Sequence, residues 1–253
     1  MPATSTAETV YVVTGANRGI GLALTSVLAR RPSTLVFATD RQPAKADDLN
    51  ALAKELGNIE VVQYEGPEAE QTKALAEAVE KKAGKVDVVF ANAGVAPPSF
   101  PVTTAPPEDL LLGFNTNVLG PITLFQALWP LLQKSSKPQF VGVSSGLGSF
   151  GLNFPVESDA YSLSKVALNY AVKRMALWHG EKDGLIAWVL SPGVVITDMS
   201  REFVAKNPFG WGPEMFLQPE QSAEAILKIA DTATVEKTGG RFWDVTTGNE
   251  FPW

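Results

Sequence analysis

Cysteine is absent from the sequence, and histidine occurs only once, at position 179. The lack of cysteine excludes disulfide bonds, thiolate metal ligands and thiol nucleophiles. A Ser-His-Asp triad or a His-rich metal site would need His179 at its centre. His179 lies late in a helical stretch beside Gly180, where a structural histidine is common. We therefore expect a structural role for His179 and no metal site.

Basic residues are outnumbered by acidic ones, and no long hydrophobic run occurs. The chain has 21 Lys and Arg against 27 Asp and Glu, a net charge of −6, whereas a nucleic-acid-binding protein normally carries a basic patch. No apolar run approaches the ~20 residues that span a bilayer. Residues 1–8 lack the basic and apolar regions of a signal peptide. We expect a cytoplasmic protein that binds neither nucleic acid nor membranes.

Hydrophobic residues make up 45% of the 253 positions, enough for one sizeable core. Short β-branched or aromatic runs alternate with amphipathic helical stretches. The expected strands are 10–13, 34–38, 59–64, 86–90, 139–143, 185–190 and 241–243. The expected helices are one that ends near Pro32, then 43–57, 67–83, 108–117, 119–134, 158–179 and 219–231. This alternation predicts an α/β fold in one domain, 1–253: a doubly wound, Rossmann-like parallel sheet with helices on both faces.

A glycine-rich turn follows the first expected strand. It runs Thr-Gly-Ala-Asn-Arg-Gly-Ile-Gly, with glycines at 15, 19 and 21. In a strand-turn-helix context such glycines let the backbone approach a phosphate, which the N–H groups of the helix N-terminus then bind. An ordinary turn between a strand and a helix is the alternative. The context favours nucleotide binding.

Asp40 and Arg41 end the second expected strand, about 20 residues beyond the glycines, where a dinucleotide fold contacts the adenosine ribose. An acid there accepts hydrogen bonds from a 2′-hydroxyl, and an Arg pairs with a 2′-phosphate. Arg18 in the glycine-rich turn adds a second positive charge. Two Arg can outweigh one Asp, so the sequence favours NADP(H) and leaves NAD(H) open. The alternative for either Arg is a solvated surface side chain.

Tyr161 and Lys165 lie four residues apart in an expected helix, so their side chains share one face. A fixed ammonium favours the phenolate and lowers a pKa that is ordinarily ~10. A phenol of this kind can donate a proton to a carbonyl oxygen. The spacing of the pair alone favours the alternative, an amphipathic helix that has one buried ring and one solvated Lys.

Other polar and small residues follow the carboxyl ends of the expected strands. They are Asn92, Ala93 and Gly94 after the fourth strand, Ser144 and Ser145 after the fifth, and Pro192 and Gly193 after the sixth. Ligands of parallel α/β sheets bind beyond the carboxyl ends of the strands. We therefore expect these residues to line one edge of the sheet with the glycine-rich turn.

These motifs, in this order, resemble the short-chain dehydrogenase/reductase family over nearly the whole chain. The turn 14–21 resembles its cofactor loop, and Asn92-Ala93-Gly94 resembles its motif after the fourth strand. The resemblance implies a catalytic tetrad of Asn117, Ser145, Tyr161 and Lys165. It implies a cofactor site of Gly15, Asn17, Arg18, Gly19, Ile20, Gly21, Asp40, Arg41, Glu65, Asn92, Ala93, Gly94, Tyr161, Lys165, Pro192, Gly193, Val195 and Thr197. Within the family, the turn and the Phe-Pro-Trp at 251–253 resemble carbonyl reductases of the sniffer and C-factor type, including fungal ketoreductases.

The chain departs from the family pattern at several positions. Ser145 precedes Tyr161 by 16 residues, which implies a longer loop at 146–160, and Ser144 is the alternative catalytic Ser. Glu65 stands where the family usually has Asp near the adenine. Asp40 stands where an NADP-dependent member usually lacks an acid, which keeps the choice of cofactor open.

The resemblance implies reversible hydride transfer between a nicotinamide and a ketone or aldehyde. Tyr161 would protonate the oxygen, Ser145 would hydrogen-bond it, Lys165 would hold the ribose, and Asn117 would hold a relay water. Residues 199–218, rich in aromatics, suit a lid over an apolar carbonyl or alcohol substrate. The long helices after residue 108 suit pairing in a homodimer or homotetramer. An NAD(H)-dependent alcohol dehydrogenase and a non-catalytic nucleotide-sensing protein are the alternatives.

Overall fold

The central feature of the protein, in a computed structural model that describes residues 8–152 and 154–253, is an eight-stranded sheet. The strand order is β10-β9-β6-β5-β4-β1-β2-β3. The bounds are β1 (Thr9–Val13), β2 (Thr34–Asp40), β3 (Ile59–Gln63), β4 (Val88–Ala91), β5 (Gln139–Val143), β6 (Ile186–Ser191), β9 (Phe242–Asp244) and β10 (Asn249–Glu250). All seven expected strands are present. The prediction of no signal peptide rests almost wholly on residues 1–7, which lie outside the described part of the chain.

The strands β1 to β6 and β9 pair in parallel, as the alternation of strands and helices predicts. The edge strand β10 differs, because it pairs with β9 in the antiparallel sense. Gly248, at φ +71°, donates its N–H to the Asp244 oxygen over 2.8 Å and so closes a tight turn between them. The sequence analysis did not predict this two-residue strand.

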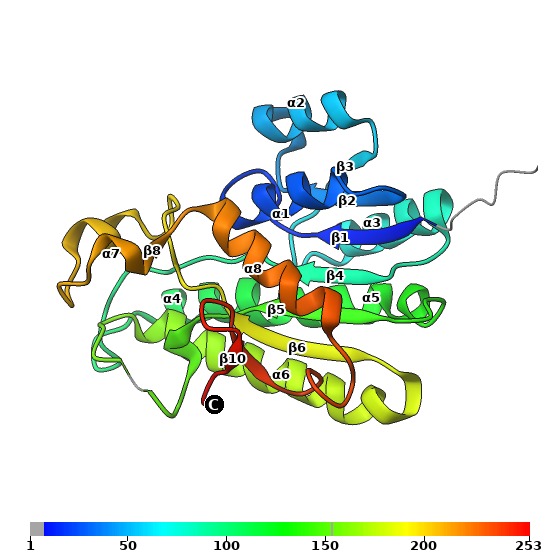
Figure 1. The fold of residues 1–253 in the computed structure, drawn as a ribbon. Helices are drawn as coiled ribbons and strands as arrows, with labels where there is room; N and C mark the ends of the chain where they lie inside the picture. The colour runs from blue at the N-terminus through cyan, green and yellow to red at the C-terminus, as the bar shows by residue number, and fades with distance from the viewer. Residues whose placement is uncertain (1–7, 153) are drawn as a thin grey trace, which may run out of the picture.

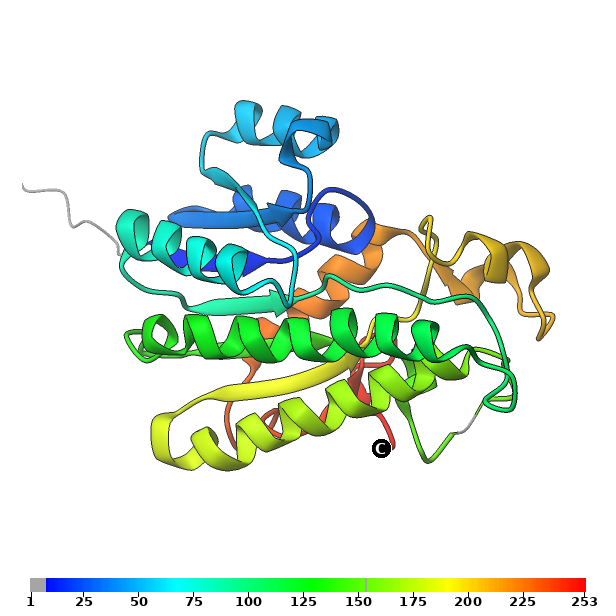
Figure 2. The ribbon, with the colours of Figure 1, turned by 180° about the vertical axis from the view of Figure 1, so that it is seen from behind.

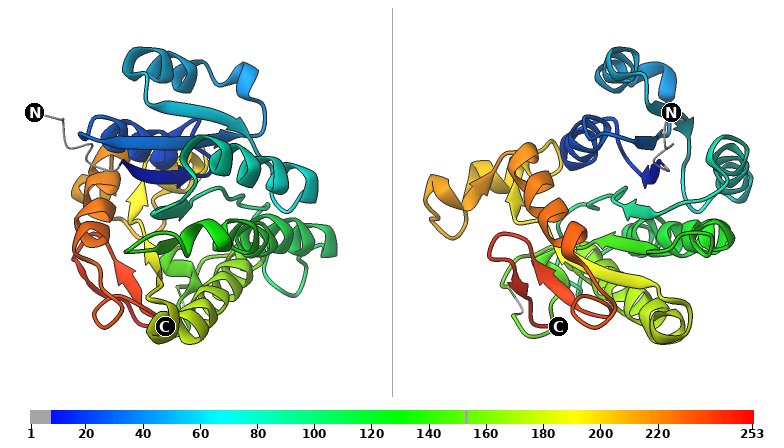
Figure 3. Two further views of the ribbon diagram at one scale, coloured as in Figure 1. Left: turned by 90° about the vertical axis from the view of Figure 1, so that its right-hand side faces the viewer. Right: turned by 45° about the vertical axis from the view of Figure 1, so that its right-hand side comes forward.

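Helices cover both faces of the sheet (Figures 1 and 3). They are α1 (Gly19–Ala29), α2 (Asp47–Leu56), α3 (Ala69–Ala83), α4 (Pro107–Phe114), α5 (Gly120–Leu132), α6 (Asp159–Asp183), α7 (Arg201–Lys206) and α8 (Pro219–Thr232). Alternate residues of a strand point to opposite faces. In β1, Tyr11 and Val13 pack in the core under α1 and α8, whereas Val10 and Val12 pack in the core under α3, α5 and α6, the face seen in Figure 2. Burial on both faces accounts for the almost uniformly apolar strands.

The predicted break between the two helices after residue 108 is a π-helical turn, η2 (Asn115–Leu119), which joins α4 to α5. Five-residue hydrogen-bonded turns of this kind occur mostly at functional sites. Helix α6 extends four residues beyond its predicted end and stops at Gly184, at φ +73°. His179 Nδ1 lies 2.7 Å from Asp183 Oδ2, and its ring lies 4.3 Å from that of Trp129. These contacts give His179 the structural setting that its position predicts.

The 199–218 segment leaves the carboxyl edge of the sheet, at the left of Figure 1. It is more regular than the sequence predicts: it contains α7, a 3₁₀ turn η4 (Pro213–Met215) and β8 (Phe216–Leu217), which pairs in parallel with β7 (Val194–Val195). Its four aromatic rings form a chain of contacts, with Phe209 stacked on Trp211 at 4.8 Å. Among the described residues, no helix is long and apolar enough to cross a membrane.

Candidate active site

The glycine-rich turn between β1 and α1 leaves the backbone bare where the sequence predicts a phosphate. Gly15 and Gly19 have φ of +64° and +53°, which L side chains rarely adopt. A Cβ on Gly21 would lie 2.2 Å from the Gly15 oxygen, so this position admits only glycine. Arg18 precedes α1 in an extended conformation and no side chain caps the helix. Within the described ranges, 8–152 and 154–253, no side chain accepts the N–H groups of the first helical turn, which fit an anion.

The turn is fastened to the end of β4 by Thr14 and Asn92. Thr14 Oγ1 accepts the N–H groups of Asn92 and Ala93 at 3.0 and 2.9 Å. Asn92 Nδ2 donates to the oxygens of Thr14 and Gly15 at 2.9 and 3.2 Å. Thr14 was not predicted individually as a site residue. Its position between the end of β1 and the first glycine of the turn was a signal that could have identified it. Asn17 and Ile20 lie partly buried in the same turn.

Asn117, in the π-helical turn, is fully buried and joins three parts of the site. Its Oδ1 accepts the N–H of Val95 at 2.8 Å, and its Nδ2 donates to the Val95 oxygen and to Ser164 Oγ, both at 2.9 Å. Ser164 in turn donates to the Tyr161 main-chain oxygen at 2.6 Å. Both N–H groups of the Asn117 amide are thus occupied. A relay water held by this residue must contact its remaining lone pairs or its main chain.

Lys165 and Gly94 meet beside Asn117. A Cβ on Gly94 would lie 3.1 Å from Asn117 Oδ1 and 3.6 Å from Lys165 Nζ, so the turn after β4 passes directly over the ammonium. Lys165 Nζ donates to the Val143 oxygen at 2.8 Å. The side chain is 4% exposed. The structure therefore brings the predicted Asn92-Ala93-Gly94 motif, Asn117 and Lys165 together.

Of the two serines after β5, Ser145 faces Tyr161. Its side chain lies close enough to the phenol to lower the pKa of Tyr161, and its hydroxyl accepts the N–H of Leu147 at 3.2 Å at the start of the 3₁₀ turn η3 (Gly146–Gly148). That turn packs tightly on α6, because a Cβ on Gly148 would lie 3.0 Å from Lys165 Cβ. Ser144 is buried, and its hydroxyl has no hydrogen-bond partner among the described residues. The geometry favours Ser145 over Ser144 as the group beside Tyr161.

The predicted lowering of the Tyr161 pKa by Lys165 is wrong for this structure. Burial raises the pKa of Tyr161 to about 12, against a smaller lowering by the Ser145 hydrogen bond. Burial also lowers the pKa of Lys165 to about 8. Desolvation disfavours the charged form of each group. The ammonium does not offset it at Tyr161, because its hydrogen bond runs to Val143 and it lies 5.4 Å from the ring centre.

Asp40, Arg41 and Glu65 lie together where the adenosine ribose is predicted. Asp40 is buried, and its Oδ1 accepts the Gln42 N–H at 2.7 Å in a turn of its own. Arg41 instead extends into solvent and pairs with Glu65 at 3.5 Å between Nη1 and Oε1. The acid that would favour NAD(H) is therefore engaged by the backbone, while the base that would favour NADP(H) is exposed.

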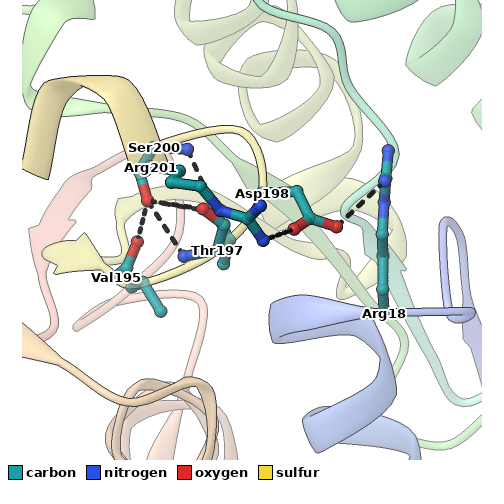
Figure 4. A network of polar contacts seen from close by, with 6 residues as sticks. All are labelled: Arg18, Val195, Thr197, Asp198, Ser200 and Arg201. Carbon is teal, nitrogen blue, oxygen red and sulfur yellow. Dashed lines mark hydrogen bonds and ion pairs between the residues drawn. The ribbon is translucent and has the colours of Figure 1, made fainter. Parts of the chain in front are cut away.

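The segment after β6 returns to the glycine-rich turn. Gly193 has φ of +81°, and a Cβ on Gly19 would lie 3.1 Å from Thr197 Cγ2, so the predicted Pro192–Thr197 segment contacts the cofactor loop. Ser200 holds this segment in shape: its hydroxyl donates to the Val195 oxygen at 2.5 Å and accepts the Thr197 N–H at 2.9 Å (Figure 4). The sequence analysis missed Ser200 and the neighbouring Asp198.

The assembled edge fits a dinucleotide. Three glycines leave a bare backbone at an uncapped helix N-terminus, and the motifs after β2, β4, β5 and β6 surround it. In a parallel sheet of this kind the carboxyl ends of the strands form the binding edge. Every predicted site segment lies at that edge. Among the described residues, no group of three or more His, Cys, Asp or Glu could hold a metal ion.

Comparison with known proteins agrees with this architecture. The family model for short chain dehydrogenases matches residues 9–208. The short chain dehydrogenase gsfK of Penicillium aethiopicum is 38% identical in an alignment 263 positions long, which covers 100% of both chains. The structure also resembles the NADPH-bound carbonyl reductase from chicken fatty liver (TM-score 0.86, 26% identity, 97% and 99% of the two chains). The carbonyl reductase Sniffer of D. melanogaster is similarly close (TM-score 0.85, 28% identity, 97% and 100%). The chain therefore belongs to the short-chain dehydrogenase family and is an oxidoreductase.

Proposed function

We propose that this protein is an NADP(H)-dependent carbonyl reductase that converts a ketone or aldehyde to an alcohol, reversibly, with Tyr161 as the general acid/base. The observation that carries the proposal is the placement of Tyr161. Its phenol lies close enough to Ser145 for that side chain to lower its pKa, and it shares a helix face with Lys165, whose Nζ lies next to Gly94. A proton donor and a second hydroxyl thus lie next to the predicted nicotinamide position.

The proposed cofactor preference rests on the charges near the predicted ribose. Arg18 and Arg41 are exposed and would pair with a 2′-phosphate, whereas one oxygen of Asp40 already accepts a backbone N–H. The chicken carbonyl reductase with a similar structure is NADPH-bound. When bound, the cofactor supplies the hydride that reduces the carbonyl carbon. Gly15, Gly19, Gly21 and the α1 N-terminus would hold its diphosphate.

The side chains around the phenol divide the remaining work. With a pKa of about 12, Tyr161 keeps its proton through the neutral range and is suited to donate it to the carbonyl oxygen as negative charge develops there. The Ser145 hydroxyl would hydrogen-bond the same oxygen and stabilise that charge. Lys165, with a pKa of about 8, stays mostly protonated at pH 7 and would hold the nicotinamide ribose. Asn117 positions α6 through Ser164.

We propose that the 199–218 segment is a lid over an apolar substrate. Phe209 of this segment lies 6.4 Å from the ring of Phe154, which belongs to the long loop after Ser145. The same two regions expose Phe150, Leu152, Met199 and Met215 to solvent. Exposed apolar side chains in both of these segments favour a hydrophobic carbonyl compound as substrate.

The decisive experiment is a screen of NADPH and NADH oxidation against aliphatic, aryl and polycyclic ketones and aldehydes. We expect turnover with hydrophobic carbonyls and a higher kcat/KM with NADPH, and we expect Arg41→Ala to reduce kcat/KM for NADPH but not for NADH. A preference for NADH in the parent protein would reverse the cofactor assignment. Tight cofactor binding without turnover of any carbonyl would favour the nucleotide-sensing alternative.

A further inference from the structure

Asp198 is a carboxylate shared by two guanidinium groups (Figure 4). Its Oδ2 lies 3.2 Å from Arg18 Nη1, and its Oδ1 lies 2.5 Å from Arg201 Nη2. Arg18 belongs to the glycine-rich turn, 180 residues earlier in the chain, and Arg201 begins α7. One side chain therefore ties the cofactor loop to the 199–218 lid.

Hydrogen bonds within the segment 195–200 hold the backbone that carries Asp198 in place. Asp198 follows Thr197, whose N–H is bonded to Ser200 Oγ at 2.9 Å, and Ser200 also bonds the Val195 oxygen. This network holds the backbone on either side of Asp198. On the cofactor side, Thr197 touches Gly19, the residue next to Arg18. The carboxylate thus stands directly across from the arginine that the proposed function assigns to the 2′-phosphate.

Arg18 has one positive charge for two anionic partners. Asp198 engages it in the structure, and a 2′-phosphate offers up to two charges and three acceptor oxygens. Both contacts are solvent-exposed, with side-chain exposures of 66% for Arg18 and 52% for Asp198, so exchange between them needs no unfolding. Asp198 keeps Arg201 as a partner when Arg18 turns away, and its charge stays paired.

We propose that Asp198 reduces the preference for NADP(H): it competes with the 2′-phosphate for Arg18 and, when cofactor is absent, holds the lid against the cofactor loop. This inference rests on the proposed NADP(H) preference. The competition weakens binding of the phosphorylated cofactor only, because NADH has no group that requires Arg18. The latch releases the lid as NADPH takes Arg18.

The first test measures Kd for NADPH and NADH by calorimetry in the parent and in Asp198→Asn, Arg18→Ala and the double variant. We expect D198N to bind NADPH about two- to fivefold more tightly, the size of an exposed ion pair, and to bind NADH unchanged. In the R18A background D198N should have no effect. The control is Glu202→Gln, which removes the exposed Lys206–Glu202 pair within α7. Its Kd values for NADPH and NADH should equal those of the parent.

Five outcomes would overturn the proposal. Equal tightening for NADPH and NADH, or tightening that persists without Arg18, would show general charge repulsion instead of competition. Weaker NADPH binding in D198N would show that Asp198 supports the bound cofactor. If the parent itself binds NADH as tightly as NADPH, the proposed function and this inference fail together. An NADPH preference with unchanged D198N binding refutes the inference alone.

The second test uses no cofactor. Trypsin cleaves after Lys206, an exposed residue at the end of α7. We expect D198N and R18A to accelerate this cleavage to the same extent, because each removes the Arg18–Asp198 ion pair. For the same reason, the double variant should be cleaved no faster than either single variant. Glu250→Gln, which removes the remote Arg241–Glu250 pair, is the control. Unchanged cleavage in D198N and R18A would show that the pair does not restrain the lid, whatever the cofactor preference.

Discussion

The Nζ atom of Lys165 lies 5.4 Å from the centre of the Tyr161 ring, yet its hydrogen bond runs to the main-chain oxygen of Val143. The two groups share a helix face but are not bonded to each other. Burial therefore moves their pKa values apart, that of Tyr161 upward and that of Lys165 downward. Both neutral forms are favoured by the protein itself, and the Ser145 side chain opposes the rise at Tyr161 only in part.

Replacing Tyr161 with Phe should abolish most turnover while leaving NADPH binding intact. The phenol is the proposed proton donor, and a positioned acid or base contributes about 10²–10⁴-fold to rate. The measurement is kcat in carbonyl reduction, with Kd for NADPH from calorimetry as the control. A Y161F variant that turns over at the parent rate would remove Tyr161 from the mechanism.

The two serines after β5 should behave differently when each is replaced by Ala. Ser145 is the serine that acts on the Tyr161 phenol, and the loss of a hydrogen bond to a developing oxyanion costs about 10²–10³ in kcat. Ser144 Oγ is buried and has no hydrogen-bond partner in the described part of the chain, so S144A should remain close to the parent. Steady-state kinetics of the matched pair decide the matter. The reverse order of effects would transfer the role to Ser144.

Replacing Lys165 with Met should change how stability depends on pH. The folded pKa of Lys165 is about 8, against an ordinary 10.5, so the unfolded state binds more protons between these values. The free energy of unfolding of the parent therefore gains from this group as pH rises from about 8 to 10.5, by at most ~3 kcal/mol. Below pH 8 the buried ammonium opposes folding.

Urea unfolding of cofactor-free parent and K165M at pH 7.5 and 10 measures this contribution. The variant should lose the rise, whereas Lys173→Met, which replaces an exposed lysine on the same helix, should keep it. An identical pH dependence in parent and K165M would mean that Lys165 is not desolvated in the folded protein.

Thr14→Val should remove hydrogen bonds that hold the glycine-rich turn against the segment after β4. The substitution removes the Thr14 acceptor from the Ala93 N–H and leaves the Asn92 N–H with the Phe90 oxygen alone, at a cost of about 2 kcal/mol in the free energy of unfolding. Thr72→Val is the matched control, since the Glu68 oxygen that Thr72 Oγ1 contacts also accepts the Thr72 N–H. We also expect the Thr14→Val variant to bind NADPH with a higher Kd than the parent. Equal urea unfolding midpoints for the two variants would show that the Thr14 hydrogen bonds do not stabilise the fold more than the Thr72 hydrogen bond does.

Local pattern was sufficient to predict the strands and most of the helices. A run such as Val10–Val13 is buried on both faces, so its composition reports its environment directly. The π-helical turn was visible as a break in periodicity at Asn117–Pro121. Short elements were missed, because the six residues of α7 and the two of β10 are too few to show a period. The short strands depend on pairing with another strand in the folded protein: β8 pairs with β7, and β10 pairs with β9.

By itself, the sequence determined the fold class and the edge of the sheet at which the site lies, since the glycine-rich turn and the motifs at 40–41, 92–94, 144–145 and 192–193 each follow a recognisable strand. Only the tertiary structure decided how those residues engage one another. Asp40 bonds Gln42 while Arg41 pairs with Glu65, Ser145 and not Ser144 meets Tyr161, and Asp198 reaches Arg18 across 180 residues. Hydrogen bonding and desolvation depend on distance and burial in the folded chain, which residue spacing along the sequence does not contain.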